Sequence, residues 1–149
     1  MTDLIARGER AKLASYELCV MPTKQKNDVL IEIANAIREN CAEIIKANQK
    51  DIDIARINGI SESLIDRLSL NESRINSIAD AVLDVVKLDD PVGKIDGGIT
   101  RPNGLVITKK RVPMGVIGII YEARPNVTVD TSLLSAGNGK IQKQSKGTT

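Results

Sequence analysis

The sequence predicts an α/β chain with a helix-rich N-terminal layer, a β-hairpin, and the first strand and helix of an open parallel sheet. Apolar residues recur at helical spacing through most of residues 1–90. Glycine and proline then interrupt this period between Pro91 and Gly104. Beyond them, Val116–Ile120 is an apolar, β-branched run, which is typical of a strand buried on both faces of a sheet.

Five amphipathic segments make up the expected helical layer. The first ends before Pro22, because proline cannot continue a helix. The third stops at Asn58-Gly59, a pair suited to a left-handed C-cap, and Ser61 and Asn71 are expected to cap the fourth and fifth. In chain order the helices are identified by Leu4, Ala11, Ala14 and Leu18; by Val29, Ile33, Ile37, Cys41 and Ile44; by the ranges 50–57 and 61–68; and by Ile75, Ile78, Ala79, Val82 and Val86.

Two short strands are expected after the helices. Ile99–Arg101 and Leu105–Thr108 flank the turn sequence Pro102-Asn103-Gly104, which predicts a hairpin. The triplet at 109–111, KKR, could indicate binding of nucleic acid or of an anionic substrate. We favour a solvated edge strand instead, because positive charge commonly blocks the addition of further strands.

The expected strand at Val116–Ile120 leads through a polar loop to a predicted helix over Thr128–Leu134. Thr128 is a candidate cap of this helix and Asp130 lies in its first turn. A strand, a polar loop and a helix N-terminus in that order form the usual ligand site of an open α/β sheet.

Composition predicts one globular domain with an aliphatic core. The 149 residues are 42% hydrophobic and 27% charged, and the aromatic residues are Tyr16 and Tyr121. We expect a cytoplasmic protein that does not contact a membrane, because no apolar run is long enough to span a bilayer and the N-terminal residues do not read as a signal peptide.

Cys19 and Cys41 could form a disulfide, a redox pair or a nucleophile. We expect two buried or half-buried thiols, since an unpaired cysteine usually behaves as a small core residue. The sequence contains no histidine, which excludes a Cys-His catalytic pair, and two thiols do not make a typical zinc site. We therefore expect no bound metal.

The run at 112–130, VPMGVIGIIYEARPNVTVD, resembles the signature of the gamma-glutamyl phosphate reductases. These enzymes, also called glutamate-5-semialdehyde dehydrogenases, are the proline-biosynthesis branch of the aldehyde dehydrogenase superfamily. Further segments are similar to the N-terminal region of that family in the same order, at 48–51 (NQKD), 58–61 (NGIS), 64–68 (LIDRL), 90–93 (DPVG) and 100–105 (TRPNGL). The resemblance covers about residues 1–130.

This resemblance implies a partial aldehyde-dehydrogenase-like domain with part of a Rossmann-like sheet. It implies an oxidoreductase that reduces L-glutamyl 5-phosphate to L-glutamate 5-semialdehyde and phosphate with NADP(H). A hairpin in this region helps subunits of the superfamily associate, so the resemblance also implies a homo-oligomer.

The site residues follow from the same resemblance. Asn126 matches the asparagine that donates to the oxyanion in aldehyde dehydrogenases, and the alternative is a turn or cap residue after Pro125. Arg124 is a candidate substrate-binding residue, or else it pairs with the neighbouring carboxylate. The positions that line the nicotinamide-ribose side of the cofactor cleft correspond to Ile120, Tyr121, Glu122 and Ala123.

The sequence departs from the family after Asp130. The nucleophilic cysteine of the family lies in a downstream domain, and neither Cys19 nor Cys41 matches it. We therefore expect residues 1–139 to form an incomplete cofactor-binding and oligomerisation part, followed by a disordered tail at 140–149. The expected product is a truncated or frameshifted reductase that is inactive alone.

Two alternatives remain from the sequence. The chain could be a non-catalytic assembly module that docks on full-length reductase subunits. It could instead be a helical nucleic-acid-binding protein, but a formal charge of +2 and the lack of stacking aromatics argue against a nucleic-acid partner.

Overall fold

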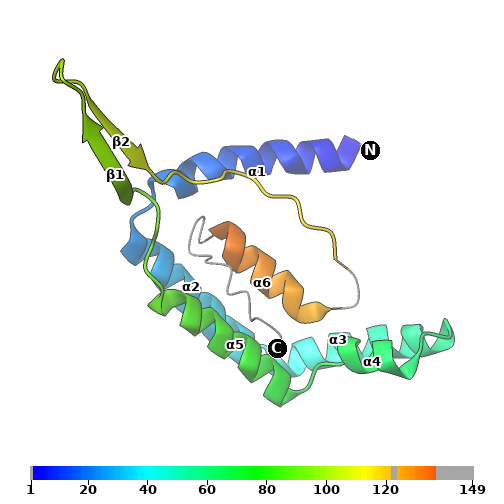
Figure 1. Cartoon of the computed structure of the whole chain (residues 1–149). Helices are drawn as coiled ribbons and strands as arrows, with labels where there is room; N and C mark the ends of the chain where they lie inside the picture. The colour runs from blue at the N-terminus through cyan, green and yellow to red at the C-terminus, as the bar shows by residue number, and fades with distance from the viewer. Residues whose placement is uncertain (1, 122–123, 137–149) are drawn as a thin grey trace, which may run out of the picture.

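The computed structural model describes residues 2–121 and 124–136 of the chain (Figure 1). The predicted tail at 140–149, and the end of the predicted domain at 137–139, lie outside the described residues. The elements are, in order, α1 (Thr2–Val20), α2 (Thr23–Glu39), α3 (Cys41–Ile57), α4 (Glu62–Leu68), α5 (Glu72–Lys87), β1 (Ile95–Thr100), β2 (Val106–Lys110) and α6 (Pro125–Ala136).

The core lies where α2 and α5 run side by side and α6 covers them (Figure 1). Leu30 and Ala34 of α2 face Ala79 and Val82 of α5, and Leu133 of α6 completes this cluster. The two alanines let the helix backbones approach closely. A second, smaller cluster of Ile52, Ala55 and Ile65 joins α3 to α4.

The predicted second helix is wrong in two respects. It was expected to run through Cys41, but α2 ends at Glu39, and α3 begins at Cys41 and absorbs the separate helix predicted at 50–57. Asn40 closes α2, because its backbone N–H and its side-chain amide both donate to the carbonyl of Ala36. In Figure 1, α3 then leaves in a different direction.

The predicted apolar stripe of α2 is also displaced around the helix. Val29 is 43% exposed, whereas the buried positions are Lys26, Leu30 and Ala34. These three lie four residues apart and therefore form the row that faces α5. The predicted member Ile33 is partly buried beside that row.

The predicted helix ends at Asn58-Gly59 and Asn71 are confirmed. Gly59 adopts a left-handed φ of 72°, and Ile60 N–H donates to the carbonyl of Ala55, as in a Schellman C-cap. Asn71 Oδ1 accepts from the backbone N–H of Arg74 at 2.8 Å. Ser61 occupies the N-cap position of α4, but its side chain makes no capping hydrogen bond.

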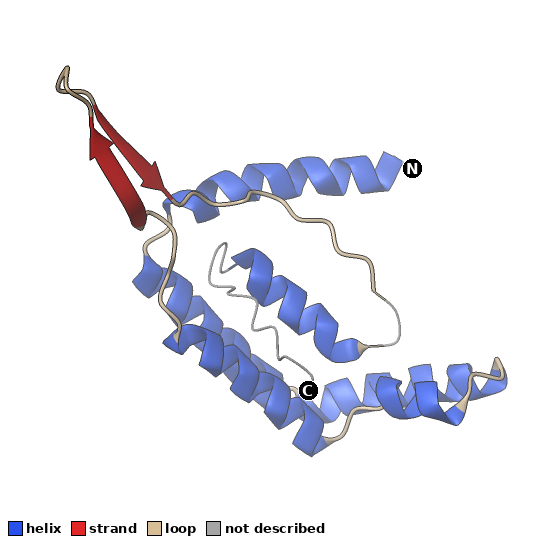
Figure 2. Cartoon of the chain, viewed as in Figure 1, coloured by secondary structure: helices blue, strands red, loops and turns tan. Residues whose placement is uncertain are grey.

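The predicted hairpin is confirmed and is longer than expected. β1 and β2 pair antiparallel, with Ile99 opposite Ile107 and a bulge between Ile95 and Gly97. The hairpin projects away from the helices, and all its residues are exposed (Figure 2). The basic residues at 109–111 lie at its base, where Arg111 pairs with Asp96 at 2.9 Å, and they are exposed as expected for a solvated edge strand. Their alternative role in binding an anion stays a hypothesis.

The predicted strand at Val116–Ile120 is not formed. Residues 111–121 have no regular secondary structure, and the only sheet in the described part of the chain is the hairpin. A strand exists only where a neighbouring backbone completes its hydrogen bonds, and no such neighbour lies beside this segment among the described residues. The side chains of Val116, Ile117, Ile119 and Ile120 are therefore exposed.

The last helix begins earlier than predicted. α6 starts at Pro125, which is favoured in a first helical turn because its missing N–H needs no partner there. Thr128 consequently lies inside the helix and is not its cap; its backbone carbonyl accepts from the Ser132 hydroxyl.

A buried ion pair ties the base of the hairpin to α2. The Lys26 ammonium donates to Asp90 Oδ2 at 3.2 Å, and both side chains are almost fully buried. Asp90 also accepts from the Thr23 hydroxyl and from the N–H of Val92. Burial by itself would raise the pKa of Asp90, but the hydrogen bonds from Val92, Lys26 and Thr23 and the charge of Lys26 together hold it below its ordinary value.

Cys19 and Cys41 are free and half-buried, as expected. Within residues 2–121 and 124–136, no group of three or more cysteines and carboxylates could hold a metal ion. None of the helices in this part of the chain is both long and apolar enough to cross a membrane.

Candidate functional site

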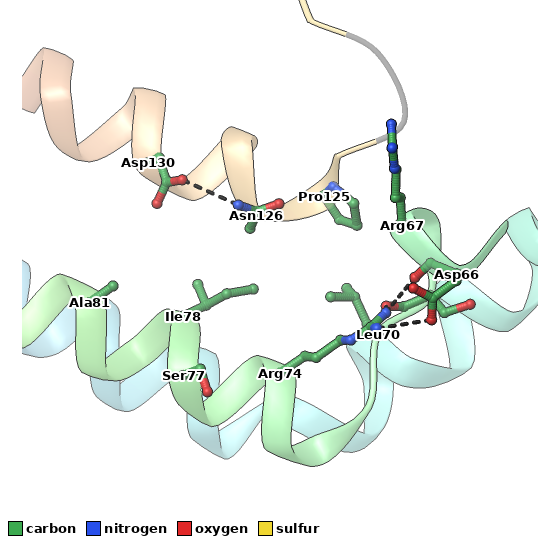
Figure 3. Close-up of a pocket in the computed structure, with 11 residues that line it drawn as sticks. Asp66, Arg67, Leu70, Arg74, Ser77, Ile78, Ala81, Pro125, Asn126 and Asp130 are labelled. Atoms are coloured by element: carbon green, nitrogen blue, oxygen red, sulfur yellow. Dashed lines mark hydrogen bonds and ion pairs between the residues drawn. The ribbon is translucent and has the colours of Figure 1, made fainter. Parts of the chain in front are cut away.

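An open cleft of about 480 Å³ lies between α5 and the first turns of α6 (Figure 3). The link between α4 and α5 closes one end of it. Ile78 and Leu70 give it an apolar side, and charged and amide side chains surround them. Its polar lining includes Arg67, Arg74, Ser77, Asn126 and Asp130.

Arg74 forms a fixed part of the lining. Its guanidinium donates to the backbone carbonyls of Asp66 and Ser69 and pairs with the Asp66 carboxylate at 2.9 Å. These bonds hold the link between α4 and α5 in place. Three of its five N–H donors and its charge are engaged in these bonds, so Arg74 supports the cleft and is less available to a ligand than a guanidinium without partners.

Arg67 is the other guanidinium of the cleft. It comes from the last turn of α4 and extends past Pro125 at one end of α6 (Figure 3). Its side chain is exposed and has no ion pair or hydrogen bond to another described residue. Arg67 is therefore available to bind an anion from solution.

Asn126 lies in the first turn of α6, on the side that faces the cleft (Figure 3). Its amide nitrogen donates to Asp130 Oδ2 at 3.4 Å, one helical turn further along. Asn126 therefore does not act as the turn or cap residue that was the alternative interpretation. Its amide has a second N–H, and its side chain is exposed to the cleft.

Asp130 is partly buried at the far end of this polar row. Burial raises the pKa of its carboxyl group, and the hydrogen bond from Asn126 offsets part of that rise. The carboxylate has several acceptor positions, so one amide donor leaves room for a cationic ligand group.

Of the other predicted site residues, the three that the structure describes do not line this cleft. Ile120 is fully exposed, and the Tyr121 hydroxyl forms a hydrogen bond with the Thr128 hydroxyl at 2.7 Å. Arg124 is exposed just before α6. The predicted cofactor residues Glu122 and Ala123 lie outside the described residues.

Sequence reasoning missed Arg67 and assigned Asp130 only to the first turn of a helix. Both stand in segments that carry the family resemblance, at 64–68 and 112–130, and this was the available signal. Their joint role could not be found from spacing, because α4 and α6 meet at this cleft only through the packing of α6 against α5.

The described residues do not form a complete dinucleotide site. The segment that contains Ile120 and Tyr121 is exposed and pairs with no neighbouring strand, so among the described residues no sheet encloses a nicotinamide ring there. An NADP(H) site would therefore need further walls from protein outside the described residues.

Comparisons with known proteins identify relatives of the chain, although no family model matches it. A gamma-glutamyl phosphate reductase from Clostridium botulinum is 51% identical over 143 residues, which are 95% of this chain and 34% of that protein. The reductase from Dictyoglomus turgidum is 47% identical over 139 residues, with 93% and 34% of the two chains covered. The chain thus spans about one third of the length of these relatives.

Solved structures give the same result. The crystal structure of gamma-glutamyl phosphate reductase from Thermotoga maritima matches with a TM-score of 0.87 and 42% identity over 91% of this chain and 33% of that chain. The enzyme from Saccharomyces cerevisiae matches with a TM-score of 0.82 and 30% identity over 88% and 33%. These matches confirm the predicted resemblance and the partial α/β fold. The match over 143 residues also extends beyond Asp130, so the expected departure from the family at that residue is wrong.

Proposed function

Since this chain matches one third of a gamma-glutamyl phosphate reductase, we propose that it supplies the oxyanion donor and part of the substrate cleft for that reaction. The reaction is the NADP(H)-dependent reduction of L-glutamyl 5-phosphate to L-glutamate 5-semialdehyde, a step of proline biosynthesis. The position of Asn126 carries the proposal: an exposed amide at the start of α6, beside a cleft, held by a hydrogen bond to Asp130.

The chemistry explains why a fixed amide is useful there. Attack on the acyl carbonyl places negative charge on its oxygen, and a preorganised N–H lowers the energy of that state. The loss of one such donor costs other enzymes about 3–4 kcal/mol of transition-state stabilisation. Asn126 is a neutral donor and therefore also tolerates the uncharged carbonyl of the substrate.

The 149 residues alone lack the rest of this machinery. Neither Cys19 nor Cys41 lines the cleft, so neither is placed to attack a carbonyl held by Asn126. We propose that these residues have no reductase activity by themselves. Ile120 and Tyr121 would contribute one edge of the NADP(H) site, and Arg124, exposed beside Pro125, would contact the substrate.

A chimera tests the role of Asn126. The matching third of the Thermotoga maritima reductase is replaced by this chain, and NADPH oxidation with L-glutamyl 5-phosphate is measured. We expect turnover by the chimera and none by the 149-residue chain. In the chimera Asn126→Ala should lower kcat about 10²–10³-fold, as for other oxyanion donors.

Asn35→Ala is the matched control for this experiment, because Asn35 is an exposed asparagine of α2 outside the cleft. The control should keep the kcat of the chimera. If the Asn126→Ala and Asn35→Ala variants of the chimera had the same kcat, the oxyanion role would be contradicted. Turnover by the 149-residue chain would contradict the proposed inactivity.

A non-catalytic assembly role is the second candidate, favoured by exposed apolar side chains. On α1 these include Leu4, Ile5, Leu13 and Val20, and the segment 112–121 adds several more. Such surface is usually covered by protein. We propose that it docks on a reductase subunit, or on a second copy of the chain through the hairpin. Co-purification with an intact reductase and light scattering test the two; a monomer that captures no reductase would exclude both.

A further inference from the structure

The polar groups of the cleft follow one another in a definite order. In Figure 3, Arg67 stands beside Pro125 at one end, Asn126 follows in the first turn of α6, and Asp130 lies one turn further along. The row thus contains a cation, a neutral amide donor and a carboxylate. A ligand that fits it carries an anionic group, a carbonyl and a cationic group in the same order.

The spacing within α6 sets the distance between the carbonyl and the cation. The Asn126 amide nitrogen and Asp130 Oδ2 lie 3.4 Å apart. Hydrogen bonds of about 3 Å from these two atoms can therefore reach two ligand atoms about 5 Å apart. In a glutamyl group, four bonds of about 1.5 Å separate the C5 carbonyl carbon from the α-nitrogen, a span of about 5 Å when extended. A glutamyl carbonyl at Asn126 therefore brings its α-ammonium to Asp130.

The other end of the row suits the phosphate. A guanidinium offers parallel N–H donors that match phosphate oxygens, and Arg67 has no partner among the described residues. Arg74, the second guanidinium, is bonded to Asp66 and to Ser69 and does not compete for that role.

We propose that this cleft selects the substrate by its two ends, with Asp130 binding the α-ammonium and Arg67 binding the acyl phosphate. The proposal rests on the proposed function and names the specificity-determining residues of that site. Asn126 remains the group at the reacting carbonyl. Asp130 has a second effect, because its hydrogen bond to Asn126 orients the amide.

Binding of two simple probes to the 149-residue chain tests each end separately. L-glutamate is compared with glutarate, which lacks the ammonium, and inorganic phosphate probes the other end. We expect tighter binding of L-glutamate, and Asp130→Asn should remove that preference, a change of about tenfold or more for a charged hydrogen bond. Arg67→Gln should weaken the binding of inorganic phosphate by a similar factor.

The two variants serve as controls for each other. Asp130→Asn should leave phosphate binding unchanged, and Arg67→Gln should leave the preference for L-glutamate unchanged, so a variant that fails to fold is recognised by the loss of both. Asp80 is a carboxylate of α5 that pairs with Arg38 outside the cleft. Asp80→Asn should therefore change neither phosphate binding nor the preference for L-glutamate.

The outcomes separate this proposal from the oxyanion role. Equal binding of L-glutamate and glutarate, or no binding of either, overturns the assignment of Asp130, and phosphate binding that survives Arg67→Gln overturns that of Arg67. In the chimera, Asp130→Asn should raise KM far more than Asn126→Ala does. If Asn126→Ala still lowers kcat about 10²–10³-fold while Asp130→Asn leaves KM unchanged, the proposed function stands and the two-ended recognition fails.

Discussion

The packed helices and the segment 112–121 are both aliphatic, yet only the helices are buried. Leu30 of α2 is 1% exposed, and Val82 of α5 is fully buried. Met114, by contrast, is 72% exposed and Ile120 is fully exposed. Apolar composition alone therefore does not produce a core. Helices α2 and α5 pack against each other, whereas the segment has no neighbouring strand among the described residues.

The difference identifies the part of the chain that stabilises itself. The helices bury apolar area against one another, so they should carry most of the free energy of folding. The segment between β2 and α6 gains little by holding one conformation. Substitutions in these two regions should therefore have unequal effects, and the experiments below measure how unequal they are.

The largest effect is expected at the buried ion pair. Lys26→Met removes the cation and leaves the Asp90 carboxylate, 8% exposed, without its charge partner. Breaking one side of a buried pair costs about 3–5 kcal/mol, and chemical denaturation measures the loss in the free energy of unfolding. Lys24→Met breaks an exposed pair with Asp28 on the same helix and should change that free energy very little.

The same pair predicts a pH dependence. The pKa of Asp90 lies below its ordinary value of 3.8 in the folded chain. Its contribution to stability is therefore fully present above 3.8 and is lost as the pH falls through the lower, folded pKa. The difference in unfolding free energy between the unsubstituted chain and Lys26→Met should therefore stay constant above about pH 5 and shrink as the pH falls below 3.8. A constant difference would show that the charge of Asp90 is not involved.

The next effect compares the two regions directly. Leu30→Ala opens a cavity between α2 and α5 and should lower the free energy of unfolding by about 2–4 kcal/mol. Ile120→Ala removes a similar number of atoms from a fully exposed side chain and should change it by less than about 0.5 kcal/mol. Equal losses would mean that the segment is packed in solution and that the comparison above is wrong.

The sequence predicted what depends on local signals. Asn71 and Gly59 mark helix ends through hydrogen bonds to nearby backbone, so their residue types were sufficient. The strand at 116–120 failed because sheet formation requires a partner that a local pattern cannot supply. The burial of Lys26 was missed for a similar reason, since Asp90 meets it across a long sequence separation.

The residues of the candidate site also differ in whether the sequence could indicate them. The family resemblance pointed to Asn126, whose oxyanion role stays a prediction, and the side chain of Asn126 lines a cleft in the structure. Arg67 could not be predicted in this way, because α4 reaches Asn126 only after α5 and α6 have packed. Residues that act through tertiary proximity leave no spacing rule in the sequence.

The smallest effect uses two glycines with the same backbone strain, one in each region. Gly59 ends α3 with φ of 72°, Gly115 lies in the exposed segment with φ of 83°, and an added Cβ meets no atom within 4 Å at either position. Alanine therefore differs between them only in how firmly the surroundings fix the left-handed conformation, which costs a side chain about 1–2 kcal/mol. Gly59→Ala should lose about 1 kcal/mol of unfolding free energy, because two hydrogen bonds hold that turn, and Gly115→Ala should lose less because the exposed segment can relax. Thermal or chemical unfolding of both variants measures these losses of unfolding free energy. If Gly115→Ala loses as much as Gly59→Ala, the segment is held in one conformation despite its exposure.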